Sequence, residues 1–422
     1  GFIMKTIIDD HKKDGLYCAF VDFTGAFDGV NRQKLIEILK RDTQIPNELI
    51  EYLAQMHNNV KAQIKGHDKQ FYENVGVKQG DPLGPKLFNI YINKLPDSVN
   101  PSGLLGGLET DPITMQTSIW KRLIKCLLYA DDLVLFSKSA EGLNKQLQKL
   151  YEYCQTLDLQ VSISKTEAMY IKSRKTKDEA SDKLPTIIYN GNIIKYADTF
   201  KYVGITISHD AKYNAHIEKA IDKANAAVHA LKHRIYKIGI DSPIDFKMTL
   251  YKAYVQPILM YGMEVLTPTG QQLDKMDDIN VAFARWALGA SPRSNRMATL
   301  TMGKLKTIRL EILKQQLNYY FTLRHRPGTC LTSTTLQHIE ESTNHPMNKY
   351  WLQPILNTMK QWGMDDAKIK MDQIMNDFEI TKGNIQEGNQ RRLKARNALQ
   401  AQTKREIEAD WTYTRTGHDT KT

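Results

Sequence analysis

Short apolar runs separated by polar corners fill the first half of the chain. Residues 16–23 are almost continuously apolar, which predicts a buried strand that ends at Asp22. Residues 123–128 and 133–136 are two more apolar runs, joined by the sequence Tyr-Ala-Asp-Asp at 129–132. Two apolar runs around a tight polar corner predict a β-hairpin with both acids at its tip.

Segments with helical periodicity lie between these strands, and they predominate after residue 210. Amphipathic helices are predicted at 1–13, 31–40, 46–56, 81–96, 141–157, 243–261 and 272–288, with an apolar stripe on a basic helix at 220–231. Further strands are predicted at 60–64, 71–77, 159–163 and 200–207, and the Asn-Gly pair at 190–191 predicts a second hairpin. The fold class is therefore α+β.

The change of pattern near residue 208 predicts three parts. An α+β part spans 1–207, a helical part spans 208–290, and a basic, mostly helical part spans 291–422. At 422 residues the chain is long enough for two or three domains with their own cores.

Charge and cysteine content narrow the class of protein. The net charge of +11 is what a partner of nucleic acid would carry, although an ordinary basic protein fits the composition equally well. The sequence has no run of about 18 apolar residues, so it predicts no membrane span. The four cysteines are scattered without a CxxC pair, which indicates reduced thiols and an intracellular protein.

One alternative metal motif lies near the C-terminus. His325, Cys330, His338 and His345 could resemble a zinc knuckle, but one cysteine without a CxxC pair fits structural zinc poorly. Trp351, Trp362 and Trp411 could stack on bases, and packing inside a helical core is the competing interpretation.

The acids carry the strongest candidate chemistry. A carboxylate that closes a buried strand needs a partner, and two adjacent carboxylates repel each other unless a cation offsets them. A β-α-β-β order places Asp22 and the tip with Asp131 and Asp132 on neighbouring strands. Three converging carboxylates can hold two divalent ions for phosphoryl transfer. The competing interpretation is an ordinary solvated turn.

The segment at 76–95 predicts a phosphate-binding helix start. Asp81 followed by Pro82 is typical of an N-cap and a first helical position, and Gly76 and Gly80 allow close backbone approach. The free N–H groups of such a helix end suit a phosphate.

Together these segments resemble the reverse transcriptase of non-LTR (LINE-type) retrotransposons. FVDFTGAFDGV resembles motif A with Asp22 as metal ligand, and GVKQGDPLGPKLFNIYIN resembles motif B. YADDLVLF resembles motif C with Asp131 and Asp132. LQVSISKTE resembles motif D with Lys165 as proton donor, and FKYVGITI resembles the primer grip with Tyr202, Val203 and Gly204. Motif B has Gly84-Pro85 where the family usually has Ser-Pro, and motif D has Ser162 where Asn is common.

The resemblance implies a polymerase palm with a remnant of fingers at 1–207, a helical thumb at 208–290 and a basic helical C-terminal region. It implies RNA-directed DNA polymerase activity with two Mg²⁺ ions, or Mn²⁺ in their place, held by Asp22, Asp131 and Asp132. Phe27 is expected to exclude a sugar 2′-OH, and Gln79, Gly80 and Tyr129 to contact the nucleotide.

The implied partners are an RNA template, a DNA primer or target and deoxynucleoside triphosphates, with no membrane. The family's fingers precede motif A, so we expect further polyprotein domains, fingers and an endonuclease, beyond these 422 residues. A nuclear or cytoplasmic ribonucleoprotein is the expected location. The alternative hypothesis is a non-catalytic remnant that binds nucleic acid without turnover.

Overall fold

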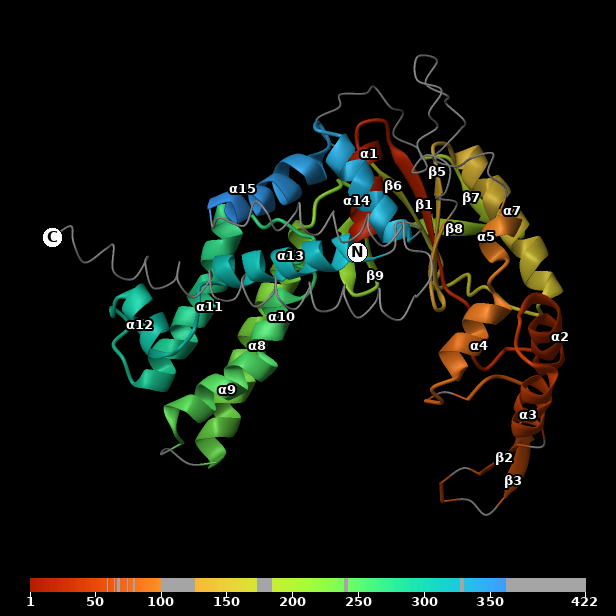
Figure 1. Ribbon diagram of the computed structural model, residues 1–422, viewed down its shortest axis with the longest axis horizontal. Coiled ribbons are helices and arrows are strands. Elements are labelled where there is room, and N and C mark those ends of the chain that lie inside the picture. Colours follow the sequence, from red (N-terminus) through yellow and green to blue (C-terminus); the bar gives the residue numbers. More distant parts are fainter. Residues whose placement is uncertain are drawn as a thin grey trace, which may run out of the picture. The chain divides into compact units, whose positions relative to one another are not determined.

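The computed structural model describes residues 1–58, 60–63, 65–66, 69–73, 75–78, 80–99, 126–172, 184–238, 242–326 and 330–361 (Figure 1). The chain divides into two compact units. The sheet unit comprises residues 11–211, and the helical unit comprises residues 1–10 and 212–422. The predicted boundaries at 207/208 and 290/291 remain predictions.

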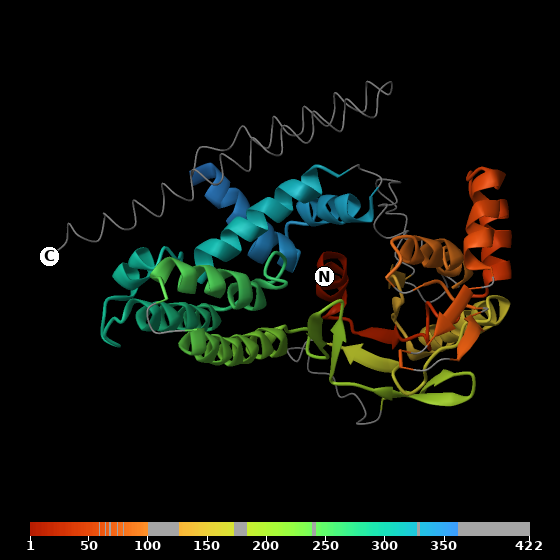
Figure 2. The same cartoon turned by 90° about the horizontal axis from the view of Figure 1, so that it is seen from below.

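The sheet unit is built on a six-stranded sheet in the order β4-β5-β1-β6-β8-β7 (Figure 2). Its strands are β1 (Leu16–Val21), β4 (Cys126–Tyr129), β5 (Asp132–Ser137), β6 (Glu167–Ile171), β7 (Ile187–Tyr189) and β8 (Asn192–Tyr196). Two hairpins stand beside it, β2 (Val60–Gln63) with β3 (Gln70–Glu73), and β9 (Thr199–Tyr202) with β10 (Ile205–Ser208).

Strand β1 lies inside the sheet because nearly all of its side chains are apolar. It pairs antiparallel with β5 on one side and with β6 on the other. Phe20 is buried in β1, and its ring stacks on Phe200 of β9 with centroids 4.1 Å apart. A buried strand with neighbours on both sides thus leads directly into Asp22.

Helices cover the sheet unit, and side-chain caps explain where two of them begin. They are α2 (Arg32–Asp42), α3 (Asn47–His57), α4 (Gly84–Tyr91), α5 (Leu95–Ser98) and α7 (Ala140–Thr156). The Asn31 side chain accepts hydrogen bonds from the N–H groups of Gln33 and Lys34, and Ser139 caps α7 in the same way. The predicted helices at 31–40, 46–56 and 141–157 are confirmed.

Three predicted elements of the sheet unit are wrong in detail. Residues 159–163 make only an isolated bridge between Phe23 and Val161, and the strand begins later, at Glu167. The single strand predicted at 200–207 is a hairpin, because Val203 and Gly204 both have positive φ and turn the chain. The helix predicted at 81–96 is two helices, α4 and α5.

The described part of the helical unit consists of helices (Figure 1). They are α1 (Phe2–His11, whose last residue falls in the sheet unit), α8 (Asn214–Ile238), α9 (Ile244–Tyr254), α10 (Gln256–Met260), α11 (Gly270–Leu288), α12 (Arg296–Met302), α13 (Ile308–Arg324), α14 (Leu331–Glu341), the short π-helix η1 (Asn348–Leu352) and α15 (Gln353–Gln361). The single helix predicted at 243–261 is two helices, because Pro257 lies in the first turn of α10.

Helix α11 is central to the helical unit. It contacts α8, α9, α12 and α13, and Tyr251 of α9 stacks on Phe283 with ring centroids 4.6 Å apart. A capping box at Thr269 and Gln272 begins the helix, and Gly289 in the left-handed region ends it. No helix within the described ranges is both long and apolar enough to cross a membrane.

Candidate active site

Asp22 lies at the end of β1, where the chain leaves the sheet. Its backbone is fixed on both sides by the loop before β6, since its N–H donates to the Thr166 hydroxyl and its carbonyl accepts from the N–H of Ser162 at 2.8 Å. One side-chain oxygen, Oδ2, is buried without a hydrogen-bond partner. A buried carboxylate oxygen in this state is costly unless a cation reaches it.

Asp131 and Asp132 lie at the predicted hairpin, which is confirmed. Tyr129 pairs with Asp132 across the turn, so Ala130 and Asp131 form its tip. Ala130 has φ of 53°, a left-handed conformation that an alanine adopts only at a cost of about 1–2 kcal/mol. The strands therefore hold both carboxylates on a short and strained turn.

The strand register brings the two acid positions together. Val21 of β1 pairs with Leu133 of β5, so the next residue outward on each strand places Asp22 beside Asp132. Burial raises the pKa of Asp132, and the negative charges of Asp131 and Asp22 raise it further. The prediction that these acids lie on neighbouring strands is confirmed, and the cluster carries more negative charge than its surroundings favour.

Lys165 lies at the same site. Its ammonium nitrogen is 3.6 Å from Asp22 Oδ2, and its side chain is largely exposed. A mobile, exposed lysine next to an acid can exchange that contact for a phosphate oxygen. The structure thus places Lys165 where the motif D prediction needs it, and its proton-donor role remains a prediction.

The loop before α4 packs directly on the residues after Asp22. The N–H of Gly76 donates to the Val30 carbonyl at 2.8 Å, and the N–H of Val77 donates to the Phe27 carbonyl at 2.9 Å. A Cβ on Gly76 would meet the Asp28 carbonyl oxygen at 2.8 Å, so only glycine allows this approach. Motifs A and B are joined through their backbones.

Three residues of the predicted nucleotide-binding set fall in this region. The Phe27 ring is half-buried, and its centroid lies 4.8 Å from that of Phe88, so it packs on the core. Gly80 has φ of 85°, and a Cβ there would meet no atom within 4 Å. Gln79 lies outside the described residues.

The helix start that was predicted at Asp81 is wrong by three residues. Helix α4 begins at Gly84, and Asp81 instead accepts a hydrogen bond from the N–H of Leu83 in the preceding turn. Pro85 in the first turn is compatible with this start, because proline lacks an N–H that the first turn does not use.

The hairpin of the predicted primer grip is also near the acids. Tyr202 is buried, and burial raises its pKa, with the negative charge of Asp132 as the next cause. Val203 and Gly204 form the turn of the hairpin. Tyr129, by contrast, is 65% exposed beside the acidic tip.

Sequence reasoning missed the residues that hold Asp22 in place. Ser162 and Thr166 bind its backbone, yet a serine and a threonine in a polar loop carry no distinguishing pattern. Their position directly around Lys165, inside the motif D segment, is the only signal that could have found them.

Comparison with known proteins agrees with this geometry. Residues 2–207 match the family model "Reverse transcriptase (RNA-dependent DNA polymerase)". The chain is 30% identical over 205 residues to the Retrovirus-related Pol polyprotein from type-1 retrotransposable element R2 of Nasonia vitripennis, which covers 46% of this chain and 18% of that protein. It is 23% identical over 256 residues to the RNA-directed DNA polymerase from mobile element jockey of Drosophila melanogaster, covering 58% and 25%.

Among solved structures, telomerase from Candida tropicalis in complex with a fragment of telomeric RNA aligns with a TM-score of 0.35 and 13% identity, over 80% of this chain and 51% of that chain. A TM-score this low does not establish a shared fold. The chain thus spans about a fifth to a quarter of the length of the R2 and jockey proteins. Residues 2–207 carry a reverse transcriptase domain, and the curated relatives of the chain are the reverse transcriptases of non-LTR retrotransposons.

Proposed function

We propose that this chain is the polymerase core of a non-LTR retrotransposon reverse transcriptase, which extends a DNA primer on an RNA template. The observation that carries the proposal is the pairing of β1 with β5, which sets Asp22 beside Asp132 inside a domain that matches the reverse transcriptase family. In this proposal the sheet unit acts as the palm, and α8 to α11 act as the thumb.

Asp22, Asp131 and Asp132 would hold two divalent ions. All three offer only oxygen ligands, which suits Mg²⁺ or Mn²⁺, and Asp22 Oδ2, which accepts no hydrogen bond, fits a metal ligand. When bound, the ions would activate the primer 3′-hydroxyl and neutralise charge on the leaving pyrophosphate.

The chain's own side chains would order the substrate and move the proton. As the 3′-oxygen attacks the α-phosphorus, the bond from that phosphorus to pyrophosphate breaks, and Lys165 gives a proton to the departing oxygen. Phe27, supported by Phe88, would leave no room for a 2′-hydroxyl on the incoming sugar. The hairpin with Tyr202 to Gly204 would hold the primer end.

The helical unit offers a surface for the nucleic acid. The exposed side of α8 carries the basic residues Lys219, Lys223, Arg234 and Lys237. Lys232 and Lys247 both lie over the ring of Trp286, at 5.4 and 5.5 Å from its centroid. Cations beside an aromatic face suit a phosphate backbone with stacked bases.

Primer extension on an RNA template with Mg²⁺ tests the proposal. Asp131→Asn should lower the rate by roughly 10²–10³-fold, because a charge that stabilises the transition state is lost. Asp198→Asn is the matched control, since that carboxylate is 96% exposed in the same unit, and it should extend normally. Near wild-type extension by Asp131→Asn would defeat the assignment.

A second measurement distinguishes the non-catalytic alternative from the proposed polymerase. A remnant that only binds would show salt-sensitive affinity for nucleic acid, with log K falling by about 0.7–0.9 per phosphate contact against log salt, and no Mg²⁺-dependent synthesis by any variant. Synthesis that appears only after an upstream segment is added would show that the chain needs a further part of the polyprotein.

A further inference from the structure

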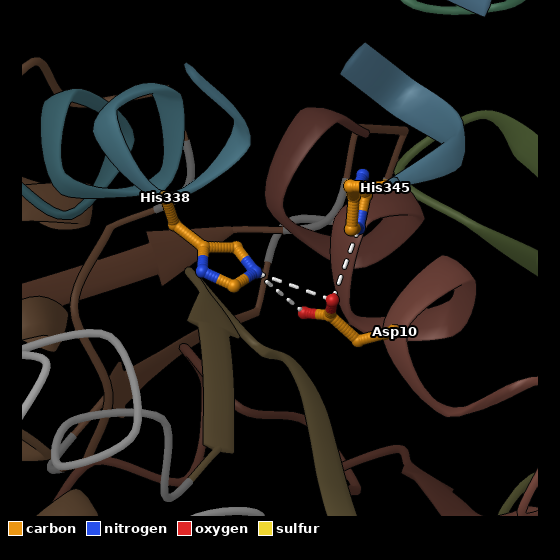
Figure 3. A group of neighbouring side chains, drawn as sticks. All are labelled: Asp10, His338 and His345. Carbon is orange, nitrogen blue, oxygen red and sulfur yellow. Dashed lines mark hydrogen bonds and ion pairs between the residues drawn. The ribbon is translucent and has the colours of Figure 1, made fainter. Parts of the chain in front are cut away.

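Three potential metal ligands meet in the helical unit, apart from the acids of the sheet unit. Asp10, His338 and His345 each direct one ligand atom to a common point, and these atoms lie within 4.8 Å of one another (Figure 3). His338 Nε2 is 3.2 Å from both carboxylate oxygens of Asp10, and His345 Nε2 is 3.1 Å from Oδ1. Among the described residues this is the one such group of histidine, cysteine and acid side chains.

Packing of the helical unit holds the three residues in place. Asp10 lies near the end of α1, His338 lies on α14, and His345 lies in the turn before η1. Phe2 at the start of α1 packs on Trp351 with centroids 5.3 Å apart, and the indole N–H of Trp351 donates to the Glu264 carbonyl at 2.7 Å. Residues 328 positions apart in the chain are therefore brought together on a fixed framework.

His345 carries the observation that points to a ligand. Its side chain is only 3% exposed, and Nε2 is buried and aimed at the cluster. Its contact is the 3.1 Å ion pair with Asp10 Oδ1, and it makes no hydrogen bond to any other group. A buried ring nitrogen that faces an acid and a second imidazole is in the position that a metal-binding histidine takes.

The donor set indicates the kind of ion. Two imidazole nitrogens and one carboxylate oxygen suit Zn²⁺ or a similar divalent transition metal, whereas Mg²⁺ prefers oxygen ligands alone. Burial alone would raise the pKa of Asp10, but hydrogen bonding with His338 and the two nearby imidazoles hold that pKa well below its ordinary value. Asp10 is thus an anion at neutral pH, which is the form that binds a metal.

We propose that Asp10, His338 Nε2 and His345 Nε2 form a Zn²⁺ site with water in the remaining position. The site would tie the first helix of the chain to α14 and to the turn before η1, and it would stabilise the helical unit. It has no part in the proposed nucleotidyl transfer, and it does not depend on that proposal being right.

One contact must change when the metal binds. The N–H of Met347 donates to His345 Nδ1 at 3.0 Å, which leaves the ring proton of a neutral His345 on Nε2. Coordination through Nε2 moves that proton to Nδ1, where it faces the Met347 N–H, so this hydrogen bond must break. Metal binding should therefore speed hydrogen exchange at the amide of Met347, a change that a purely structural histidine would not produce.

Metal titration of the full chain tests the proposal. Zn²⁺ and Co²⁺ should each bind one per chain, and bound Co²⁺, the visible reporter, should give a d–d spectrum that excess Mg²⁺ does not remove. His338→Gln and His345→Gln should each weaken binding by at least roughly tenfold. His229→Gln is the matched control, because His229 is exposed on α8 of the same unit, and it should bind as the wild type does.

Two outcomes would overturn the site. Absence of a stoichiometric Co²⁺ spectrum, or equal binding by all three variants, would show that the cluster is only an Asp–His contact. If a variant does not fold, as judged by its circular dichroism, X-ray absorption of the Zn²⁺-loaded wild type decides without it. The proposal requires nitrogen and oxygen neighbours alone, and a sulfur neighbour would contradict it by pointing to a cysteine such as Cys330.

Discussion

Two clusters of potential metal ligands lie in the described part of this molecule, and they differ in what surrounds the negative charge. In the sheet unit, the strand register sets Asp22 beside Asp132, Asp131 is the next residue in the hairpin turn, and the pKa of Asp132 is raised by burial and by these acidic neighbours. In the helical unit, Asp10 faces two imidazoles, and its pKa is lowered despite its burial. The first cluster needs cations from outside the chain to offset its charge, whereas the second is already largely compensated.

The comparison shows how donor chemistry would separate the two functions proposed for this chain. Oxygen ligands alone bind hard ions loosely enough for substrate phosphates to share them, which suits catalysis. A mixed nitrogen and oxygen set binds a transition metal more firmly, which suits a structural role. The scaffolds of the two clusters also differ. In the sheet unit, strand ends hold the acids at an exposed turn, whereas in the helical unit packed helices hold a buried contact.

Exchange of one metal ion for another should produce the largest difference between the two clusters. Chelation should stop primer extension, and Mg²⁺ should restore it by roughly 10³-fold or more, because several kcal/mol of transition-state stabilisation return with the ions. Zn²⁺ alone should instead raise the unfolding midpoint of the helical unit without restoring extension. Extension that is supported equally by Zn²⁺ and Mg²⁺ would remove the distinction.

Core substitutions should show that only one of the two scaffolds supports the acidic site. Phe20→Ala should cost about 3–5 kcal/mol of unfolding free energy, since a buried ring stacked on Phe200 is lost, and it should also weaken Mn²⁺ binding next to β1. Phe283→Ala is the matched change in the helical unit, where the buried ring stacks on Tyr251. Denaturant melts and Mn²⁺ titrations should find a similar loss of stability there, with Mn²⁺ affinity unchanged.

A substitution in the turn of the acidic hairpin should have the smallest effect of the three. Ala130→Gly should stabilise the protein by about 0.5–1 kcal/mol, because relief of the left-handed strain exceeds the added entropy of the unfolded chain. Thermal unfolding of the metal-free protein measures this. A loss of stability would mean that Ala130 is not strained, and the tip would then be an ordinary turn.

The sequence predicted the parts of the site that local pattern determines. The hairpin around Ala130 and Asp131 and the Asn190-Gly191 hairpin follow from apolar runs and turn residues that lie side by side in the chain. The pairing that brings Asp22 to Asp132 was also predictable, because each acid ends or begins a strongly apolar strand.

The remainder depends on contacts that no local pattern records. Val203 turns the chain with a positive φ, which a β-branched residue seldom adopts, so the β9–β10 hairpin was taken for one strand. Leu159 and Val161 are apolar like strand residues, yet the loop hydrogen-bonds the backbone of Asp22 instead of extending the sheet. The sequence groups His338 and His345 with His325 and Cys330, whereas both contact Asp10, which lies 328 residues before His338.

Anomalous scattering from Mn²⁺ in crystals of the full chain with an RNA template, a DNA primer and an incoming nucleotide tests the central claim most directly. The account predicts Mn²⁺ within about 2.5 Å of carboxylate oxygens of both Asp22 and one acid of the hairpin tip. Mn²⁺ that binds elsewhere, or an Asp22 side chain too far from Asp131 and Asp132 to share an ion with them, would contradict it.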